Sequence, residues 1–337
     1  MPWKGEKDPY KIWISEIILQ QTRVQQGLAY YQKFIKAFPD VKSLATAEEQ
    51  KVFKLWEGLG YYSRCRNLIA SAKYIHEHLD GEFPVEFNDI LSLKGIGNYT
   101  ASAISSFAFN KPYAVLDGNV FRVLARFFGI EIPINTTVGK KHFNELAQFL
   151  LDKKNPGEYN QAIMDFGAVI CKPGIPLCEE CPLQSNCVAF LEQKITFLPV
   201  NEKVISRKER FFNYFIVEYK GHIYIKERTQ KDIWQNLNEF LLVETDNLLC
   251  ETDFLNDQNV SALFKKNKLK VKFVSKVFSQ KLTHQTISGR FFHIELKKPL
   301  DALEKYKLVP KKSIEQLPFP KFITSYLTDK NVSLNLI

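Results

Sequence analysis

The stretch Leu93-Lys94-Gly95-Ile96-Gly97 lies between a helical pattern that ends near position 93 and another that begins near position 98. Its two glycines permit a tight turn whose backbone N–H groups point outward at the start of the second helix. Such a turn binds phosphate oxygens without reading a base sequence. A plain turn between two helices explains the same residues equally well, so the glycines alone leave both interpretations open.

An acidic residue follows this turn about twenty positions later, within the sequence VLDGNV at positions 115–120. Asp117 comes after two apolar residues and directly before a glycine, which is a typical position for a helix cap. It is also a carboxylate close in sequence to a turn that can hold phosphate. Asp117 therefore remains a candidate for either a structural cap or a catalytic group, and it favours the phosphate-binding interpretation of the turn.

Glu16 is the second candidate carboxylate. It shares one helix face with Gln20 and Arg23, and its surroundings include Trp13 and Ile17. Apolar surroundings of this kind desolvate a carboxylate and let it hold a proton near neutral pH. An ordinary surface glutamate is the simpler interpretation, and the spacing does not decide between the two.

Outward from these motifs, the first 195 residues have a helical pattern. Trp13, Ile17, Gln20 and Val24 recur at helical spacing, and glycines or prolines interrupt the pattern at regular intervals. The alternation of β-branched residues that marks a sheet is largely missing here. A chain of 337 residues is long enough for two domains. We therefore expect residues 1–195 to form an all-α region.

The composition changes after Leu198-Pro199. Residues 196–210 are polar and basic and are predicted to be a linker. Short runs rich in β-branched and aromatic residues follow, and residues 313–328 are predicted to form a closing helix. We expect an α+β domain at 211–337. The predicted strands cover Phe211–Val217, His222–Ile225, Phe240–Val243, Val271–Val274 and Phe291–Leu296.

The charge of the chain is basic and unevenly distributed. The net charge is +9. Residues 196–337 carry 24 Lys and Arg against 16 Asp and Glu, which gives +8 of that total. A basic surplus is typical of proteins that bind polyanions, although many solvated surfaces share it. No apolar stretch is long enough for a membrane helix, and the N-terminus lacks a secretory signal.

Four of the six cysteines lie within 17 residues, in the pattern C-x6-C-x2-C-x5-C. Clustered cysteines in a chain without a secretion signal indicate metal ligands more than disulfides. Zinc sites usually have two knuckles separated by a longer segment, and iron–sulfur clusters are also held by four thiolates. The spacing favours iron–sulfur moderately over zinc. The four residues are Cys171, Cys178, Cys181 and Cys187.

The segment Lys265–Lys276 carries six lysines and no acid. Lys268, Lys270 and Lys272 alternate with apolar residues, so they form one basic face of a predicted strand. This face suits contact with DNA phosphates, but lysines also protect an edge strand from aggregation. Both interpretations are equally good.

These motifs occur together in the helix-hairpin-helix DNA glycosylases of the endonuclease III superfamily, and the sequence most resembles their A/G-specific adenine DNA glycosylase (MutY) family. The resemblance implies an all-α helix-hairpin-helix domain with a [4Fe–4S] cluster loop, followed by an α+β Nudix-like domain. The matching segments are Trp13–Thr22, Gly58–Arg64, Lys94–Ala101, Leu116–Val120 and the cysteine cluster.

The resemblance also implies roles for individual residues in the first half. Glu16 would protonate the leaving adenine, Asp117 would stay ionised and stabilise the cationic sugar, and Tyr99 and Asn119 would position these groups. Endonuclease III-type enzymes have a nucleophilic lysine where this chain has Tyr99, so a monofunctional glycosylase is expected. DNA contacts are expected from Gln21, Tyr61, Gly95 and Gly97, and cluster ligation from Cys171, Cys178, Cys181 and Cys187.

In the second half, Asp232–Phe240 resembles the Nudix-like domain of the family. No Nudix box is present, so pyrophosphate hydrolysis is not expected. Leu282–Gln285 is similar to the family's Phe-Ser-His loop, with Leu and Thr substituted, which implies that Thr283 and His284 recognise 8-oxoguanine. Family members usually carry a helical stretch before a Pro-Trp-Arg segment. This chain begins at Met1-Pro2-Trp3-Lys4, so we expect a misassigned start or a less stable product.

The resemblance therefore implies a base-excision-repair enzyme that flips out and hydrolyses adenine opposite 8-oxoguanine or guanine in duplex DNA. It also implies a monomer that is cytoplasmic and associated with a bacterial nucleoid. Three alternatives remain. An endonuclease III-like glycosylase with lyase activity would be trapped on DNA by borohydride. A non-catalytic helix-hairpin-helix protein would release no adenine, and a zinc-dependent regulator would be colourless.

Overall fold

The helical pattern of the first half corresponds to helices throughout that part of the computed structural model, which describes residues 4–22, 24–202, 207–252, 254–264 and 269–329. The prediction of an all-α region is confirmed. The helices are α1 (Pro9–Leu19), α2 (Val24–Ala37), α3 (Val41–Ala45), α4 (Glu49–Trp56), α5 (Tyr62–His78), α6 (Phe87–Ser92), α7 (Asn98–Phe109), α8 (Gly118–Phe128), α9 (Thr137–Leu150), α10 (Pro156–Val169) and α11 (Val188–Leu191).

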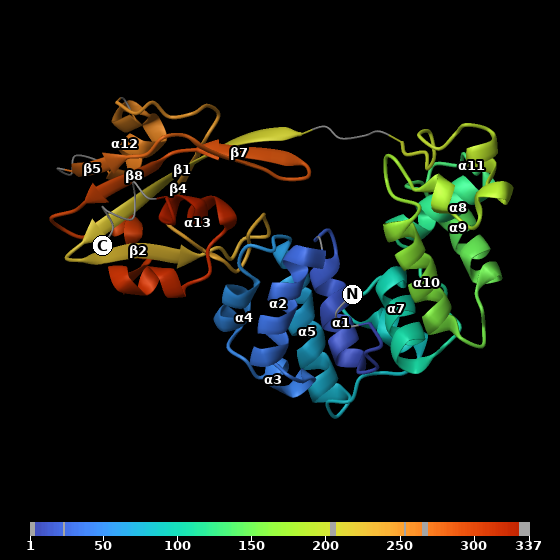
Figure 1. Cartoon of the computed structure of the whole chain (residues 1–337). Helices are drawn as coiled ribbons and strands as arrows, with labels where there is room; N and C mark the ends of the chain where they lie inside the picture. Colours follow the sequence, from blue (N-terminus) through green and yellow to red (C-terminus); the bar gives the residue numbers. More distant parts are fainter. Residues whose placement is uncertain (1–3, 23, 203–206, 253, 265–268, 330–337) are drawn as a thin grey trace. The chain divides into compact units, whose positions relative to one another are not determined.

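The chain forms two compact units (Figure 1). Among the described residues, the first unit contains 4–47 and 66–202, and the second contains 48–65 and 207–329. Residues 48–65, which include α4, therefore pack with the second half of the sequence. Met1–Trp3, Arg23, the linker residues 203–206 and the lysine segment 265–268 lie outside the described residues.

Helix α1 begins and ends where local chemistry dictates. The Asp8 carboxylate accepts a hydrogen bond from the backbone N–H of Tyr10, and Pro9 occupies the first turn, where its missing N–H costs nothing. The helix ends at Leu19 because Gln21 has a left-handed backbone with φ of 56°. Trp13 and Ile17 therefore share α1, whereas Gln20 is its C-cap and Val24 begins α2, so the helical spacing of these four residues crosses a break between two helices.

The core of the first unit near the catalytic motifs lies among α7, α8, α9 and α10. Helix α8 has a strongly one-sided apolar pattern, because Val120, Leu124 and Ala125 face this core. Helix α7 packs against both α1 and α10. As a result α1 and α10 lie on the two sides of α7, and residues far apart in the sequence meet there.

The second unit is built around one mixed sheet. The strand order β3-β2-β1-β7-β6 forms one path, while β4 and β8 also pair with β1, β5 pairs with β8, and β9 pairs with β2. The strands are β1 (Lys208–Tyr219), β2 (His222–Glu227), β3 (Asn238–Glu239), β4 (Leu241–Thr245), β5 (Lys270–Val274), β6 (Phe278–Lys281), β7 (Gln285–Gly289), β8 (Phe291–Glu295) and β9 (Lys307–Pro310).

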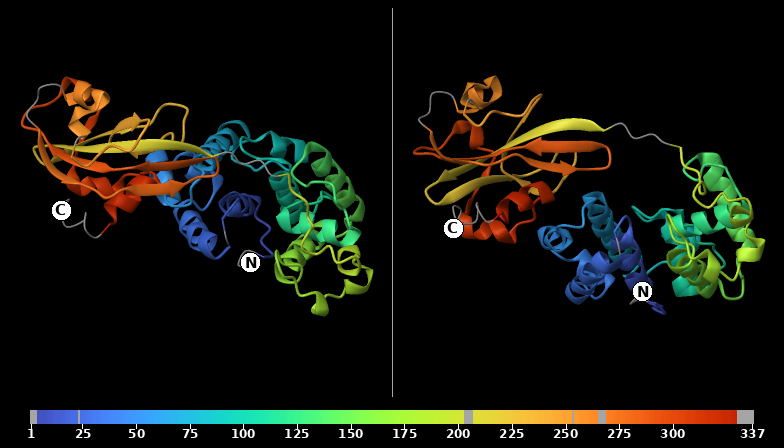
Figure 2. Two further views of the ribbon diagram at one scale, coloured as in Figure 1. Left: turned by 90° about the horizontal axis from the view of Figure 1, so that it is seen from above. Right: turned by 45° about the horizontal axis from the view of Figure 1, so that its top comes forward.

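Two helices cover opposite faces of this sheet (Figure 2). Phe215 of β1 packs with Phe264 of α12 (Gln258–Phe264), while the neighbouring Tyr214 packs with Phe322 of α13 (Lys321–Leu327). Because successive side chains of a strand point to opposite faces, β1 is buried on both sides. The α+β prediction is confirmed, and α13 lies inside the predicted closing helix.

The β6–β7 hairpin is not among the predicted strands, because Phe278–Lys281 has no β-branched residue and Gln285–Gly289 has only two. The hairpin turn consists of residues 282–284, so the predicted recognition segment lies at its tip. Of the predicted basic strand, Lys270 and Lys272 lie on β5 and both form ion pairs with Glu295. Acids of neighbouring strands thus neutralise part of this face.

Candidate active site

Glu16 is a buried carboxylate, with only 5% of its surface exposed. Burial raises its pKa to about 7, and repulsion from Asp117 acts in the same direction. A hydrogen bond from the hydroxyl of Tyr99 to Oε2, 2.7 Å long, opposes this rise because it stabilises the ionised form. The surface-glutamate interpretation is wrong. Glu16 is placed to hold and release a proton near neutral pH.

Tyr99 comes from the first turn of α7, directly after the hairpin turn. Gly95 has φ of 83°, and a side chain there would lie 2.6 Å from Cβ of Asn67, so glycine is required for both reasons. Gly97 instead has extended backbone and open space around it. The hairpin prediction is confirmed, although only one of its two glycines is needed by the fold. Gly97 leaves the backbone open for a ligand.

Asp117 caps α8, so the structural interpretation of this residue is confirmed. Its Oδ1 accepts the backbone N–H of Asn119 and of Val120, and Oδ2 accepts the side-chain amide of Asn119. Burial raises its pKa, while these hydrogen bonds and Arg122 oppose the rise. Asp117 also acts electrostatically on Glu16 and Tyr99, which places the two carboxyl groups in one neighbourhood. Capping and catalysis are therefore compatible.

A buried arginine links Asp117 to the start of the cysteine segment. Arg122 donates from Nε to the carbonyl of Cys171 at 2.7 Å and from Nη2 to the carbonyl of Gly167 at 2.7 Å. Nη2 also lies 2.9 Å from Oδ1 of Asn119, whose amide holds Asp117. Arg122 has no signal in the sequence, since an arginine on an amphipathic helix usually faces solvent.

We expect Arg122→Gln to lower the free energy of unfolding by about 3 kcal/mol, because it leaves the carbonyls of Gly167 and Cys171 without a buried donor. Urea unfolding followed by circular dichroism measures this. Lys140→Gln on the exposed side of α9 is the matched control and should change stability by less than about 0.5 kcal/mol. Equal stabilities of the two variants would contradict the linking role of Arg122.

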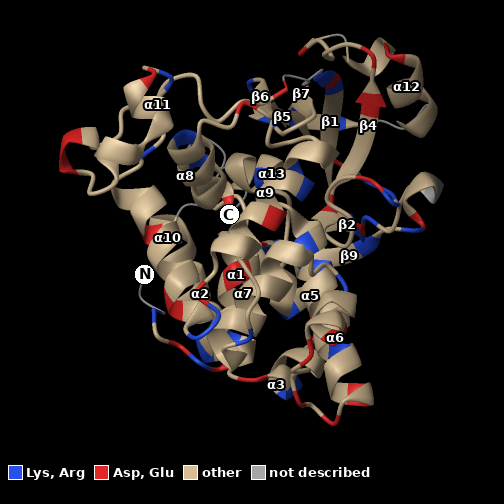
Figure 3. Ribbon diagram, turned by 90° about the vertical axis from the view of Figure 1, so that its right-hand side faces the viewer, with Lys and Arg blue, Asp and Glu red and all other residues tan. Residues whose placement is uncertain are grey.

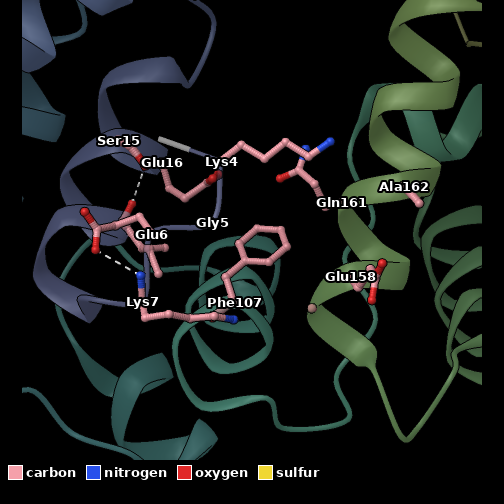
Figure 4. A pocket seen from close by; sticks show the side chains of 12 residues that line it. Lys4, Gly5, Glu6, Lys7, Ser15, Glu16, Phe107, Glu158, Gln161 and Ala162 are labelled. Atoms are coloured by element: carbon pink, nitrogen blue, oxygen red, sulfur yellow. Dashed lines mark hydrogen bonds between the residues drawn. The ribbon is translucent and has the colours of Figure 1, made fainter. Parts of the chain in front are cut away.

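A cavity of about 330 Å³ lies beside Glu16 (Figure 4). Helices α1 and α10 form its two sides, and Phe107 of α7 lies between them. Ser15, Glu16, Glu158 and Gln161 line it from the two helices. The segment before α1 adds the charged residues Lys4, Glu6 and Lys7, and Ile12, Phe107 and Ala162 form the apolar part of the wall. Such a cavity suits a flat heterocycle with polar edges. Glu158 and Gln161 were missed, because single polar residues on a helix give no sequence signal.

A glycine sets the distance between two walls of this cavity. A side chain at Gly157, at the start of α10, would lie 2.7 Å from the carbonyl oxygen of Ser106 in α7. The helices can therefore approach this closely only with glycine at that position. At the mouth of the cavity, Lys4 forms an ion pair with Asp165 at 2.9 Å.

The two residues expected to enter the DNA helix share an unusual backbone. Gln21 and Tyr61 are both exposed, and their φ angles of 56° and 49° are left-handed. Residues other than glycine rarely adopt this conformation, and such strain concentrates at functional sites. Gln21 belongs to the first unit and Tyr61 to the second.

Within the second unit, Tyr61 contacts the predicted recognition segment directly. Its hydroxyl lies 2.7 Å from Oγ1 of Thr283 at the tip of the β6–β7 hairpin. The backbone carbonyl of His284 accepts a hydrogen bond from the N–H of Lys208 on β1, which anchors the tip to the sheet. Two motifs more than 200 residues apart in the sequence therefore meet. Both Thr283 and His284 have exposed side chains.

The four clustered cysteines line one hollow with apolar neighbours such as Ile170 and Phe190. Arg126 lies beside them, with Nη1 3.5 Å from the Sγ of Cys171. Among the described residues, no three cysteine, histidine or acidic side chains are close enough together to hold a single metal ion. Four thiols around one hollow suit an iron–sulfur cluster, which is larger than a single ion and in which each thiolate binds a separate iron atom.

Comparisons with known proteins agree with this geometry. Residues 14–148 match the family model described as HhH-GPD superfamily base excision DNA repair protein. An adenine DNA glycosylase of Buchnera aphidicola subsp. Baizongia pistaciae is 36% identical over 295 residues, covering 85% of this chain and 79% of that protein. The adenine DNA glycosylase of Mus musculus is 41% identical over 199 residues, covering 56% and 39%.

Solved structures show the same fold in the helical part. A thermostable thymine-DNA glycosylase superposes with a TM-score of 0.53 at 30% identity, covering 57% of this chain and 88% of that one. An endonuclease III–DNA complex superposes with a TM-score of 0.50 at 19% identity, covering 56% of this chain and 86% of that one.

Among the described residues, no helix is both long and apolar enough to cross a membrane.

Proposed function

This chain belongs to the adenine DNA glycosylase family of the HhH-GPD superfamily, and from that premise we propose that it hydrolyses adenine paired with 8-oxoguanine or guanine in duplex DNA. It is a base-excision-repair glycosylase. The observation that supports the chemistry best is the electrostatic interaction between two carboxyl groups, the buried Glu16, which lines the cavity of about 330 Å³, and the half-buried Asp117. The relatives are named adenine DNA glycosylases, so the proposal goes beyond those names in stating which base lies opposite the adenine.

The extruded adenine would occupy the cavity between α1 and α10. Extrusion costs a few kcal/mol and is cheapest at a mispair. An adenine in this cavity would have Glu16 on one side and Glu158 on the other, because the two residues line it from α1 and α10. The amino group of adenine is a donor and a carboxylate is an acceptor, so Glu158 is suited to bind it. Gln161 would add a second polar contact.

Hydrolysis needs a protonated leaving base and a stabilised cationic sugar. With a pKa of about 7, Glu16 is protonated in about half of the molecules at neutral pH and can donate this proton to adenine. Asp117 receives three hydrogen bonds that favour its ionised form, so its charge can stabilise the sugar. After the base leaves, the deprotonated Glu16 is suited to activate the attacking water.

Tyr99→Phe should move the alkaline limb of the pH–rate profile to higher pH. Tyr99 stays neutral, since burial and Glu16 raise its pKa well above the usual range, and its hydrogen bond favours ionised Glu16. Removing that bond raises the pKa of Glu16, so the catalytic proton persists to higher pH. Single-turnover rates across the neutral and alkaline range measure the shift. An unmoved or lowered limb would show that Glu16 is not the acid.

Recognition of 8-oxoguanine would come from the tip of the β6–β7 hairpin. This base carries a donor at N7 where guanine has an acceptor. The Thr283 hydroxyl is exposed at the tip and can accept that hydrogen, while its neighbour Tyr61 supplies an adjacent ring. The hydrogen bond between them fixes where both groups point.

The direct test uses duplexes with A:8-oxoguanine, A:G and T:8-oxoguanine, followed by alkali cleavage of abasic sites. We expect fast adenine release opposite 8-oxoguanine, slower release opposite guanine, and no thymine release. Thr283→Val keeps the shape of the side chain but removes its hydroxyl, so it should reduce the preference for 8-oxoguanine over guanine. The control is Thr328→Val, which makes the same change at the residue that caps the C-terminus of α13. Equal rates opposite both purines would contradict the proposed recognition.

We also propose that Cys171, Cys178, Cys181 and Cys187 hold a [4Fe–4S] cluster and that the enzyme is monofunctional. The reaction transfers no electrons, so the cluster would serve to order the 171–187 segment. Purified protein should then be yellow-brown, whereas zinc would leave it colourless. Tyr99 occupies the position of the superfamily's nucleophilic lysine and cannot form an imine. Borohydride should therefore trap no covalent complex with DNA.

A further inference from the structure

A second polar hollow lies in the second unit, between the edge strand β6 and helix α13. It has a volume of about 290 Å³. Phe278 and Phe322 form its apolar floor, and Lys281 and Lys321 stand on its two sides with Ser279 and Ser325. We call these residues the β6–α13 groove. Lys281 directly precedes the hairpin tip that carries Thr283 and His284.

The groove presents backbone donors as well as lysines. β6 lies at the end of the path β3-β2-β1-β7-β6 and pairs on one side with β7. The N–H of Leu282 points across the hairpin to the carbonyl of Gln285. Because successive backbone groups of a strand alternate in direction, the N–H groups of Lys281 and Ser279 point to the free edge. Unpaired edge N–H groups bind anions well.

The lysines of the groove carry uncompensated charge. Lys281 and Lys321 are exposed, and among the described residues neither forms an ion pair with an acid. The nearby Lys276 differs, since it pairs with Asp329 at 2.7 Å. Figure 3 marks the Lys and Arg positions of the chain in blue along the ribbon. Two free ammonium groups, two backbone N–H groups and two hydroxyls make a site that suits a phosphate group.

We propose that the β6–α13 groove binds a backbone phosphate of the DNA strand that contains the 8-oxoguanine. This rests on the proposed function and adds how the second unit holds that strand. Lys281 is two residues from Thr283, which is about 7 Å along a strand. A phosphate held there lies within one or two nucleotides of a base at the tip. The contact fixes the register of the strand without reading sequence.

Binding of a duplex at increasing salt concentration tests the proposal. The probe is a duplex with 8-oxoguanine opposite 2′-fluoro-2′-deoxyadenosine, whose fluorine destabilises the cationic sugar and prevents hydrolysis. We expect Lys281→Ala/Lys321→Ala to reduce the slope of log K against log salt by about 0.9 for each phosphate that the variant no longer binds. Between about 50 and 200 mM salt, the affinity of the variant then falls about 3.5-fold less per phosphate than that of the wild type.

Lys297→Ala/Lys298→Ala is the matched control. These lysines are also adjacent to the sheet and exposed, but they follow β8 at the opposite end of β1 from the hairpin tip. This control should keep the wild-type slope, and Lys281→Arg/Lys321→Arg should restore it. The single-turnover rate at saturating protein should stay unchanged in Lys297→Ala/Lys298→Ala, because these lysines lie outside the proposed site and the carboxyl groups belong to the first unit.

Two results would overturn the proposal while leaving the proposed function intact. One is a wild-type slope for Lys281→Ala/Lys321→Ala. The other is an equal reduction of the slope in both alanine pairs, which would indicate diffuse charge. If the variant binds DNA normally but self-associates, the lysines protect the β6 edge instead. Failure of the wild-type protein to release adenine would instead contradict the proposed function.

Discussion

Glu16→Gln is expected to lower the single-turnover rate of adenine release by about 10³-fold, within the range that general acids contribute. Glutamine keeps the shape of the side chain and can accept the hydrogen bond from Tyr99, but it has no proton to donate. DNA binding should persist, because glutamine keeps the size of a side chain that is only 5% exposed. Glu6→Gln is the control. Glu6 lines the same cavity, but its carboxylate accepts the backbone N–H groups of Lys7 and Asp8.

The same substitution should stabilise the protein at alkaline pH. Burial raises the pKa of Glu16 from 4.5 to about 7, so the folded state favours the protonated form. The associated stability is present below pH 4.5 and is lost as the pH rises to 7. Above pH 7 the wild type therefore carries a penalty of about 3 kcal/mol, which glutamine removes. A variant that is inactive and also less stable at alkaline pH would contradict this account.

Asp117→Asn is expected to reduce adenine release by about 10²- to 10³-fold, since the charge that stabilises the cationic sugar is lost. Asparagine is as good a helix cap as aspartate, so α8 should keep its start at Gly118. Asp117→Ala removes the cap as well and should cost about 1 kcal/mol of stability in addition.

The comparison of these two variants separates catalysis from folding. If both lose activity equally while only Asp117→Ala loses stability, the carboxylate acts chemically. Losing the charge of Asp117 should also lower the pKa of Glu16, because Asp117 raises it. In the pH–rate profile of the residual activity of Asp117→Asn, the alkaline limb should therefore lie at lower pH than in the wild type. Near-normal activity in Asp117→Asn would show that the residue only caps the helix.

The sequence predicted those parts of the site that depend on local chemistry. The turn at Gly95 and the cap at Asp117 are short-range features, and both are present as expected. The apolar neighbours of Glu16 indicated burial as one alternative, but a surface glutamate was the simpler interpretation and only the structure decides between them. These features require only the residues within one or two helical turns.

The remaining parts depend on contacts between distant segments. Arg122 reaches Cys171 across 49 positions, and Tyr61 reaches Thr283 across 222, so neither contact has a local signal. Glu158 becomes part of the site only because α10 packs on α7. The assignment of residues 48–65 to the second unit likewise depends on tertiary packing. A single sequence contains no periodicity that reports such contacts.

The close approach of α10 to α7 at Gly157 has a consequence for substrate range. Because any larger residue there must push α10 away from Ser106, the width of the base cavity is set by one missing methyl group. Alanine or serine at this position would leave the acid in place but open the space opposite to it. If the cavity holds the extruded base as proposed, bulkier, chemically damaged purines should then fit through a change that touches neither carboxyl group.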